Sequence, residues 1–189
     1  VVQNNTATSF DGGGVYLEQE DSTLTATGNG TSVTVDSNTA GQRGGGVVAQ
    51  LGADVLVESG AALVVQTNTA ASFDGGGVYL EHEKSTLTAT GNSTRVTVVS
   101  NTAGQHGGGV FSVSGADVMV ESGAALVVQN NTATSLYGGG VYLQSEGSTF
   151  TATGNSTRVT VESNTAGQSG GGLFSNSGAD IIVESGAAL

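Results

Sequence analysis

The chain has 189 residues, of which 32 are glycine, and it contains no proline, cysteine or tryptophan. Its four Lys and Arg residues stand against 16 Asp and Glu, a formal net charge of −12. This balance argues against nucleic-acid binding, because phosphate contacts need basic side chains. The absence of cysteine excludes disulfides and cysteine-bound metals, and no apolar run approaches the roughly 20 residues of a membrane span.

Internal repetition dominates the sequence. Residues 1–63, 64–126 and 127–189 align without a gap, and the first two repeats differ at 13 positions, so they match at 50 of 63. Each repeat has two related halves that read V-x-x-N-T-A, a short loop, then G-G-G-V. The unit is therefore about 30 residues long and occurs six times, a period typical of solenoids.

Each unit is predicted to hold three short strands, because polar and apolar residues alternate, as in the run Ser-Thr-Leu-Thr-Ala-Thr. In two consecutive units these strands are Ala61–Gln66, Gly75–Glu81 and Ser85–Thr90, then Ser93–Val98, Gly107–Val113 and Ala116–Glu121. No helical periodicity is present. The pattern predicts an all-β fold, a right-handed parallel β-helix of six coils, with two coils per 63-residue repeat. Residues 1–189 would form one continuous solenoid.

Alternation also predicts which side chains face the interior. Leu24 and Ala26 share one face, and the threonines between them share the other. In the next coil that outer face carries Asp54 and Glu58, so it must be exposed to solvent. The predicted core positions of the first repeat are Val15, Leu17, Leu24, Ala26, Val33, Val35, Val55, Val57, Leu63 and Val65.

One asparagine per coil recurs at the same point of the motif. These residues are Asn5, Asn38, Asn68, Asn101, Asn131 and Asn164. Stacked asparagine side chains can hydrogen-bond along a solenoid axis. We expect a structural asparagine ladder rather than a catalytic array.

A large side chain also recurs once in each coil, on the parity of Glu18 and Glu81. The members of this aromatic column are Tyr16, Val48, Tyr79, Phe111, Tyr142 and Phe174. That parity predicts that the column faces outward, where an exposed apolar stripe would form a lateral interface. The alternatives are that neighbouring loops cover the column or that the parity is reversed.

Threonines on the outer face resemble an ice-binding array, but the acidic residues of alternate coils interrupt it.

Enzymatic function is also disfavoured. The acidic columns repeat along the rod and create no single constellation in a pocket, and neither histidine recurs in the other repeats. We expect no catalytic residues, no metal site and no cofactor, because the run Gly12-Gly13-Gly14 lacks both the Asp of a calcium repeat and the Lys of a phosphate loop.

Sequons are the one modification signal. Asn29, Asn92 and Asn155 each begin an N-x-[ST] motif at the same position of the three repeats. In a eukaryotic secreted protein they would be N-glycosylation sites, and glycans would be partners of this surface.

The two motifs V-x-x-N-T-A and G-G-G-V-[YVF] resemble the F-x-x-N and G-G-A-[ILV] repeats of polymorphic outer-membrane proteins and autotransporter passenger domains. The resemblance covers all six coils, with Val in place of Phe and Gly in place of Ala at Gly14 and its copies. It implies a right-handed β-helix with an extracellular or cell-surface structural role.

The repeat boundaries divide a strand, and both ends lack a polar cap, so we expect an excerpt of a longer array or a unit that stacks head to tail. The leading functional prediction is a structural protein of an extracellular filament, appendage or surface layer, whose partners are copies of itself. The alternative is an adhesin stalk that presents a tip elsewhere in the full protein. A polysaccharide-active enzyme and an ice-binding protein are weaker candidates.

Overall fold

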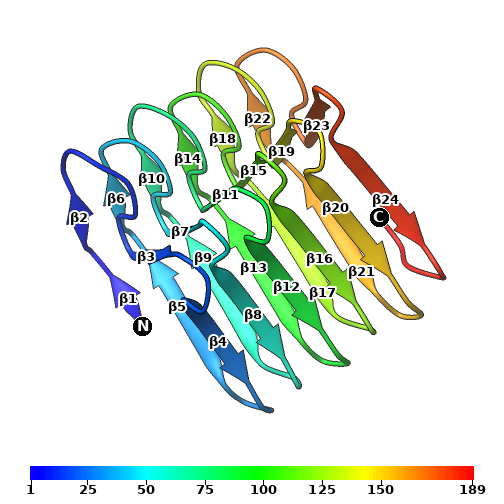
Figure 1. Ribbon diagram of the computed structural model, residues 1–189. Coiled ribbons are helices and arrows are strands. Elements are labelled where there is room, and N and C mark those ends of the chain that lie inside the picture. The colour runs from blue at the N-terminus through cyan, green and yellow to red at the C-terminus, as the bar shows by residue number, and fades with distance from the viewer.

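The computed structural model describes residues 1–189 and is an all-β solenoid of about six turns, which confirms the predicted fold class. Successive coils lie side by side along one axis, from the N-terminal coil to the C-terminal coil (Figure 1). Each coil contributes one strand to each of four parallel six-stranded sheets. No helix is present that could cross a membrane.

The four sheets, here called A to D, follow each other around every coil. Sheet A contains β1 (Val2–Gln3), β5 (Ser32–Asp36), β9 (Ala62–Gln66), β13 (Arg95–Val99), β17 (Ala125–Gln129) and β21 (Arg158–Glu162). Sheet B contains β2 (Thr6–Ala7), β6 (Thr39–Ala40), β10 (Thr69–Ala70), β14 (Thr102–Ala103), β18 (Thr132–Ala133) and β22 (Thr165–Ala166). Sheet C contains β3 (Val15–Glu18), β7 (Val47–Gln50), β11 (Val78–Glu81), β15 (Val110–Val113), β19 (Val141–Gln144) and β23 (Leu173–Asn176). Sheet D contains β4 (Thr23–Thr27), β8 (Asp54–Glu58), β12 (Thr86–Thr90), β16 (Asp117–Glu121), β20 (Thr149–Thr153) and β24 (Asp180–Glu184).

The short strands of sheet B are an addition to the three strands expected per coil. Each is the Thr-Ala pair that follows the ladder asparagine of the motif, as in β10, where Thr69 pairs with Thr39 and Thr102. Two residues are too few to show a period, so alternation could not reveal them.

Between sheets A and B every coil turns through one non-glycine residue in the left-handed region, with φ between 55° and 58°. These residues are Asn4, Ser37, Thr67, Ser100, Asn130 and Ser163. Left-handed backbone at a side-chain-bearing residue costs about 1 kcal/mol or more, and Asn and Ser are among the residues that form such turns. This corner places the next residue, the ladder asparagine, inside the coil.

The interior of the solenoid holds a cluster of 28 buried residues, built almost entirely from Val, Leu and Ala. Six of the predicted core positions of the first repeat belong to it, and the other four, Val15, Leu17, Leu24 and Val33, are partly buried and pack against it. The parity prediction for sheets A and D is therefore confirmed. Because each rung contacts only its neighbours, stability accumulates coil by coil.

Candidate functional surfaces

The asparagine ladder forms as predicted and runs the length of the molecule. The four central members are fully buried. The Oδ1 atom of Asn101 accepts hydrogen bonds from the backbone N–H of Asn68 at 2.9 Å and from its Nδ2 at 3.0 Å. Asn101 in turn donates its Nδ2 to Oδ1 of Asn131 at 3.0 Å and to the carbonyl oxygen of Val65 at 3.0 Å. Each amide thus joins neighbouring coils, which is a structural function.

The glycine runs bring consecutive coils close together beside this ladder. The first glycine of a run, such as Gly75, has a φ of 65°. The third glycine is required because a side chain would not fit. A Cβ on Gly77 would lie 2.6 Å from the carbonyl oxygen of Gly109 and 3.0 Å from Nδ2 of Asn101. The runs lack the Lys of a phosphate-binding loop, and the contacts give these glycines a packing role.

The aromatic column faces outward from sheet C, but the prediction that it is exposed is wrong for most of its length. Val48, Tyr79, Phe111 and Tyr142 are between 0% and 3% exposed and form a second small core, with Phe174 partly buried against it. Only Tyr16, in the first coil, remains largely exposed at 45%. These side chains therefore provide no continuous lateral interface.

The cover consists of the loops that join sheets B and C, which are here called the B–C loops (residues 8–14, 41–46, 71–77, 104–109, 134–140 and 167–172). His106 stacks on Tyr142 and on Tyr137, with ring centroids 5.0 and 5.6 Å apart. Tyr137 in turn lies 4.9 Å from the ring of Phe174. The His106 ring also contacts Asp74, with 2.7 Å between Nδ1 and Oδ1. The alternative of loop cover was thus the right one.

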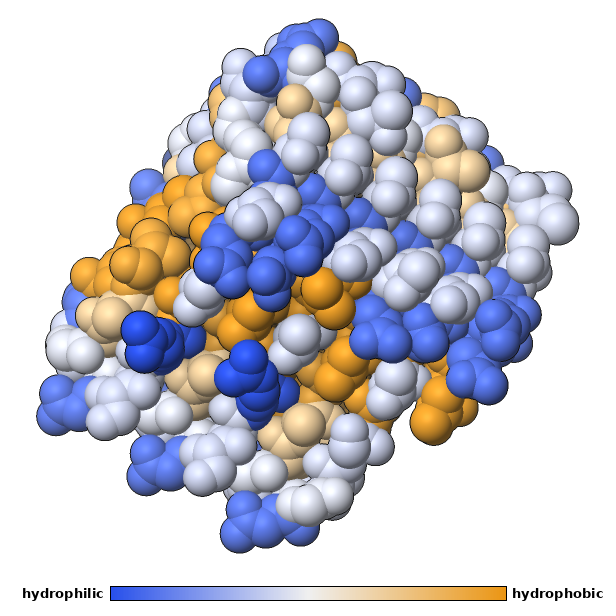
Figure 2. Space-filling model, turned by 180° about the vertical axis from the view of Figure 1, so that it is seen from behind, coloured by the Kyte–Doolittle hydropathy of each residue, from blue (hydrophilic) through white to orange (hydrophobic).

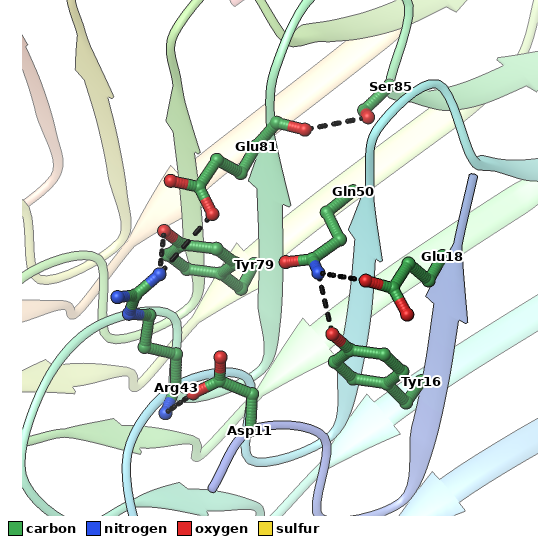
Figure 3. Close-up of polar contacts among 8 residues, drawn as sticks. All are labelled: Asp11, Tyr16, Glu18, Arg43, Gln50, Tyr79, Glu81 and Ser85. Atoms are coloured by element: carbon green, nitrogen blue, oxygen red, sulfur yellow. Dashed lines mark hydrogen bonds and ion pairs between the residues drawn. The ribbon is translucent and has the colours of Figure 1, made fainter. Parts of the chain in front are cut away.

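Arg43 covers the same surface two coils earlier (Figure 3). Its Nη1 donates to the hydroxyl of Tyr79 at 3.0 Å and to Oε2 of Glu81 at 3.3 Å, and its guanidinium lies 5.4 Å from the Tyr79 ring centroid. Burial raises the pKa of the Tyr79 phenol well above its ordinary value, and the nearby Glu81 charge raises it further. The phenol is therefore a neutral structural group.

Tyr16 has a more open environment (Figure 3). Its hydroxyl accepts a hydrogen bond from Nε2 of Gln50 at 2.6 Å, and the same nitrogen contacts Oε1 of Glu18 at 3.3 Å. Phe10, from the first B–C loop, is 74% exposed and lines a shallow hollow with Asp11 and Tyr16. Loop cover begins only in the second coil.

The outer face of sheet D carries the threonine array and the acidic columns in alternating coils. Thr86 and Thr149 donate their hydroxyls to the carboxylates of Asp54 and Asp117 at 2.7 Å in both cases. Asp54 and Asp117 are therefore hydrogen-bonded to the neighbouring coil along the axis. No group of three or more His, Asp or Glu side chains able to hold a metal ion is present.

The sequon asparagines Asn29, Asn92 and Asn155 are all exposed, in the turns between sheets D and A. The sequon threonine Thr94 is buried, and its hydroxyl donates to the carbonyl of Thr90 at 2.9 Å and accepts from the N–H of Gly60 at 3.0 Å. In the Asn92 sequon the asparagine is therefore accessible and the hydroxyl is not, whereas Thr31 of the Asn29 sequon is exposed.

Two basic residues that the sequence analysis did not single out, Arg95 and Arg158, occupy equivalent outward positions on sheet A. Their spacing of 63 residues was the available signal. Neither forms an ion pair, whereas Arg43 pairs with Glu81 and Lys84 with Glu20.

Fold and surfaces together define a β-solenoid repeat protein whose side chains are organised in axial columns. Comparison with protein-family models and with curated proteins gives no match. Among solved structures, the crystal structure of a TibC-catalysed hyper-glycosylated TibA fragment aligns with 97% of this chain and 84% of that one. The identity is 19% and the TM-score 0.17, values at which the likeness carries no argument about function.

Proposed function

We propose that the chain is a structural element of an extracellular filament, appendage or surface layer. The observation that carries this proposal is the position of the repeat boundaries. Leu63 and Val64 are consecutive residues of β9, and Leu126 and Val127 are consecutive residues of β17. One 63-residue repeat therefore passes into the next inside a strand, with sheets and ladders uninterrupted, and further repeats can be added in the same register.

The role is mechanical rather than catalytic. Parallel backbone hydrogen bonds join each coil to its neighbours in all four sheets, and the asparagine ladder adds buried side-chain bonds along the same axis. Force along the rod is thereby shared among many bonds. The same rung repeats throughout, in contrast to the single constellation that an enzyme needs.

In this function the partners are copies of the same chain, stacked end to end and associated side by side. The formal charge of −12 keeps the rods soluble and limits unspecific aggregation. In a secretory pathway that attaches N-glycans, the exposed Asn29, Asn92 and Asn155 would carry them.

Negative-stain electron microscopy of the purified chain at rising concentration tests the end-to-end component. A single chain of six coils is about 29 Å long at 4.8 Å per coil. We expect rods much longer than this, with constant width. A chain that stays a 29 Å rod at every concentration would contradict end-to-end stacking, and a globular head on rods of the natural protein would favour the adhesin stalk.

A further inference from the structure

The outer face of sheet A is uncovered and close to neutral, unlike the loop-covered face of sheet C and the acidic face of sheet D. Its side chains fall into three columns along the axis. The first column holds Ser32, Ala62, Arg95, Ala125 and Arg158, the middle one Thr34, Val64, Thr97, Val127 and Thr160, and the third Asp36, Gln66, Val99, Gln129 and Glu162. All of them are half-buried or exposed. Figure 2, seen from behind, shows apolar side chains exposed among polar ones on this side of the molecule.

The charges of this face are arranged by column. The first column carries both arginines, which have no acidic partner within the chain. The third column carries Asp36 and Glu162. A shallow groove crosses β17 between the arginines, where Ala125 is smaller than Arg95 and Arg158 on the flanking strands.

These columns complement one another under one particular symmetry. If two sheet A faces meet about a two-fold axis parallel to the rod, the first column of each opposes the third column of the other, rung by rung. The opposed pairs are Ser32 with Asp36, Ala62 with Gln66, Arg95 with Val99, Ala125 with Gln129, and Arg158 with Glu162. Every rung then joins a small side chain to a larger one, an arginine stem to a valine, or opposite charges. The middle column packs against itself, Val127 on Val127 and Val64 on Val64.

Antiparallel pairing of the same faces lacks this fit, because each column then opposes its own counterpart and no arginine meets an acid in any register. Centred on β13, such a pair puts Arg95 against Arg95 and Asp36 against Glu162. Centred on β17, it puts Arg95 against Arg158. Like charges in direct opposition disfavour both arrangements.

Sheet D cannot replace sheet A as the partner face. Its outward carboxylates are Asp54, Glu58, Asp117, Glu121, Asp180 and Glu184. Two such faces repel each other. If sheet D packed against sheet A, its carboxylates would oppose Asp36 and Glu162 of the third column as well as the arginines of the first column.

We propose that the outer face of sheet A binds the same face of a second copy, with the two rods parallel and a two-fold axis along the rod direction. This inference rests on the proposed structural function and names its lateral surface. Parallel pairing leaves both rods free to lengthen in the same direction, and each added repeat extends the interface.

The size of the face sets the expected affinity. Five full rungs at 4.8 Å and five residues per strand at 3.3 Å outline about 400 Å² per partner. A stable interface buries about 800 Å² per partner. The 189-residue chain should therefore dimerise weakly, and an array of twice as many repeats should dimerise far more strongly.

Sedimentation equilibrium of the chain at concentrations up to about 1 mM, where an interface of this size is expected to form, tests the pairing. Arg158→Glu and Glu162→Arg each create two like-charge oppositions, and we expect each to weaken dimerisation about tenfold, or 1.4 kcal/mol. The double charge swap restores the opposition and should return the affinity to within about threefold of the original. Val127→Lys, which places lysine against lysine, should abolish dimerisation, whereas Thr151→Lys on sheet D is the matched control and should not.

A chain that stays monomeric at 1 mM, a double swap that fails to restore pairing, or equal effects of Val127→Lys and Thr151→Lys would overturn the proposal. Microscopy separates this outcome from failure of the function itself. Long single-width rods that persist in the sheet A variants would leave end-to-end stacking intact while refuting lateral pairing. Pairs of short rods that never lengthen would support lateral pairing while refuting end-to-end stacking.

Discussion

Replacement of Asn101 by alanine tests whether the asparagine ladder holds the coils together. The Oδ1 atom of Asn101 is the acceptor for two donors of Asn68, its backbone N–H and one hydrogen of its Nδ2. Both residues are 0% exposed. Alanine in place of Asn101 leaves both donors without a partner inside the solenoid.

The expected loss follows from those two donors. A buried donor without an acceptor costs about 1–3 kcal/mol, so two cost about 2–6 kcal/mol, and a water entering the vacated space would move the loss toward the lower end. We expect the free energy of unfolding to fall by about 4 kcal/mol. Urea unfolding followed by far-ultraviolet circular dichroism measures this loss.

Asn92→Ala is the matched control, because the same atoms are removed from an exposed turn. It should change the stability by less than about 0.5 kcal/mol. Hydrogen exchange adds a local readout, since the Asn68 amide should lose protection in Asn101→Ala alone. If the two variants unfold within about 1 kcal/mol of each other and the Asn68 amide stays protected, the ladder does not stabilise the coil contacts and the reasoning is refuted.

Three further outcomes are expected. Gly77→Ala should lower stability by about 3 kcal/mol in thermal or urea unfolding, because its Cβ would meet the next coil's backbone at 2.6 Å; an unchanged midpoint would show that the coils can separate freely. Phe111→Ala should cost about 3 kcal/mol and Tyr16→Ala less than about 1 kcal/mol, because Phe111 is 3% exposed and Tyr16 45%; equal losses would contradict the loop cover. Burial raises the pKa of the Tyr79 phenol above its ordinary 10.0. As the pH rises above that value, the phenol loses its proton in the unfolded chain before it does so in the folded chain. The free energy of unfolding should therefore fall by up to about 1.4 kcal/mol per pH unit. Tyr79→Phe should reduce this slope in unfolding experiments between about pH 10 and 11, and an unaltered slope would exclude Tyr79 as its source.

Much of the architecture could be predicted because it depends on short-range patterns. Alternation within Ser22–Asn29 determines which side chains face the core, since successive side chains of any strand point to opposite faces. The unit of about 30 residues places Asn38, Asn68 and Asn101 at one point of consecutive coils, and from there the ladder follows. Among the four sheets, only the two-residue strands of sheet B were not predicted, because they are too short to show an alternating pattern.

The surfaces were predicted less well, and the aromatic column shows why. Its outward direction is a local property and was correct, but its exposure depends on where the B–C loops run. These loops combine Gly, Ser, Thr and Gln with an occasional aromatic or charged residue, and they carry no polar–apolar alternation. Nothing local indicates that His106 and Tyr137 fold back onto Tyr142.

Sheet A shows the same limit, because its exposure to solvent could not be predicted from the sequence. The repeat places Ala125 and Arg158 at one point of consecutive coils, and the register of β17 with β21 agrees, but no local pattern shows whether loops cover that column. Strand direction, spacing and inner or outer facing are set by the chain locally, because they depend on the backbone geometry of a few residues. Which outer faces stay open, and which charges meet there, depends on contacts between residues about 30 positions apart, and therefore only the folded solenoid decides it.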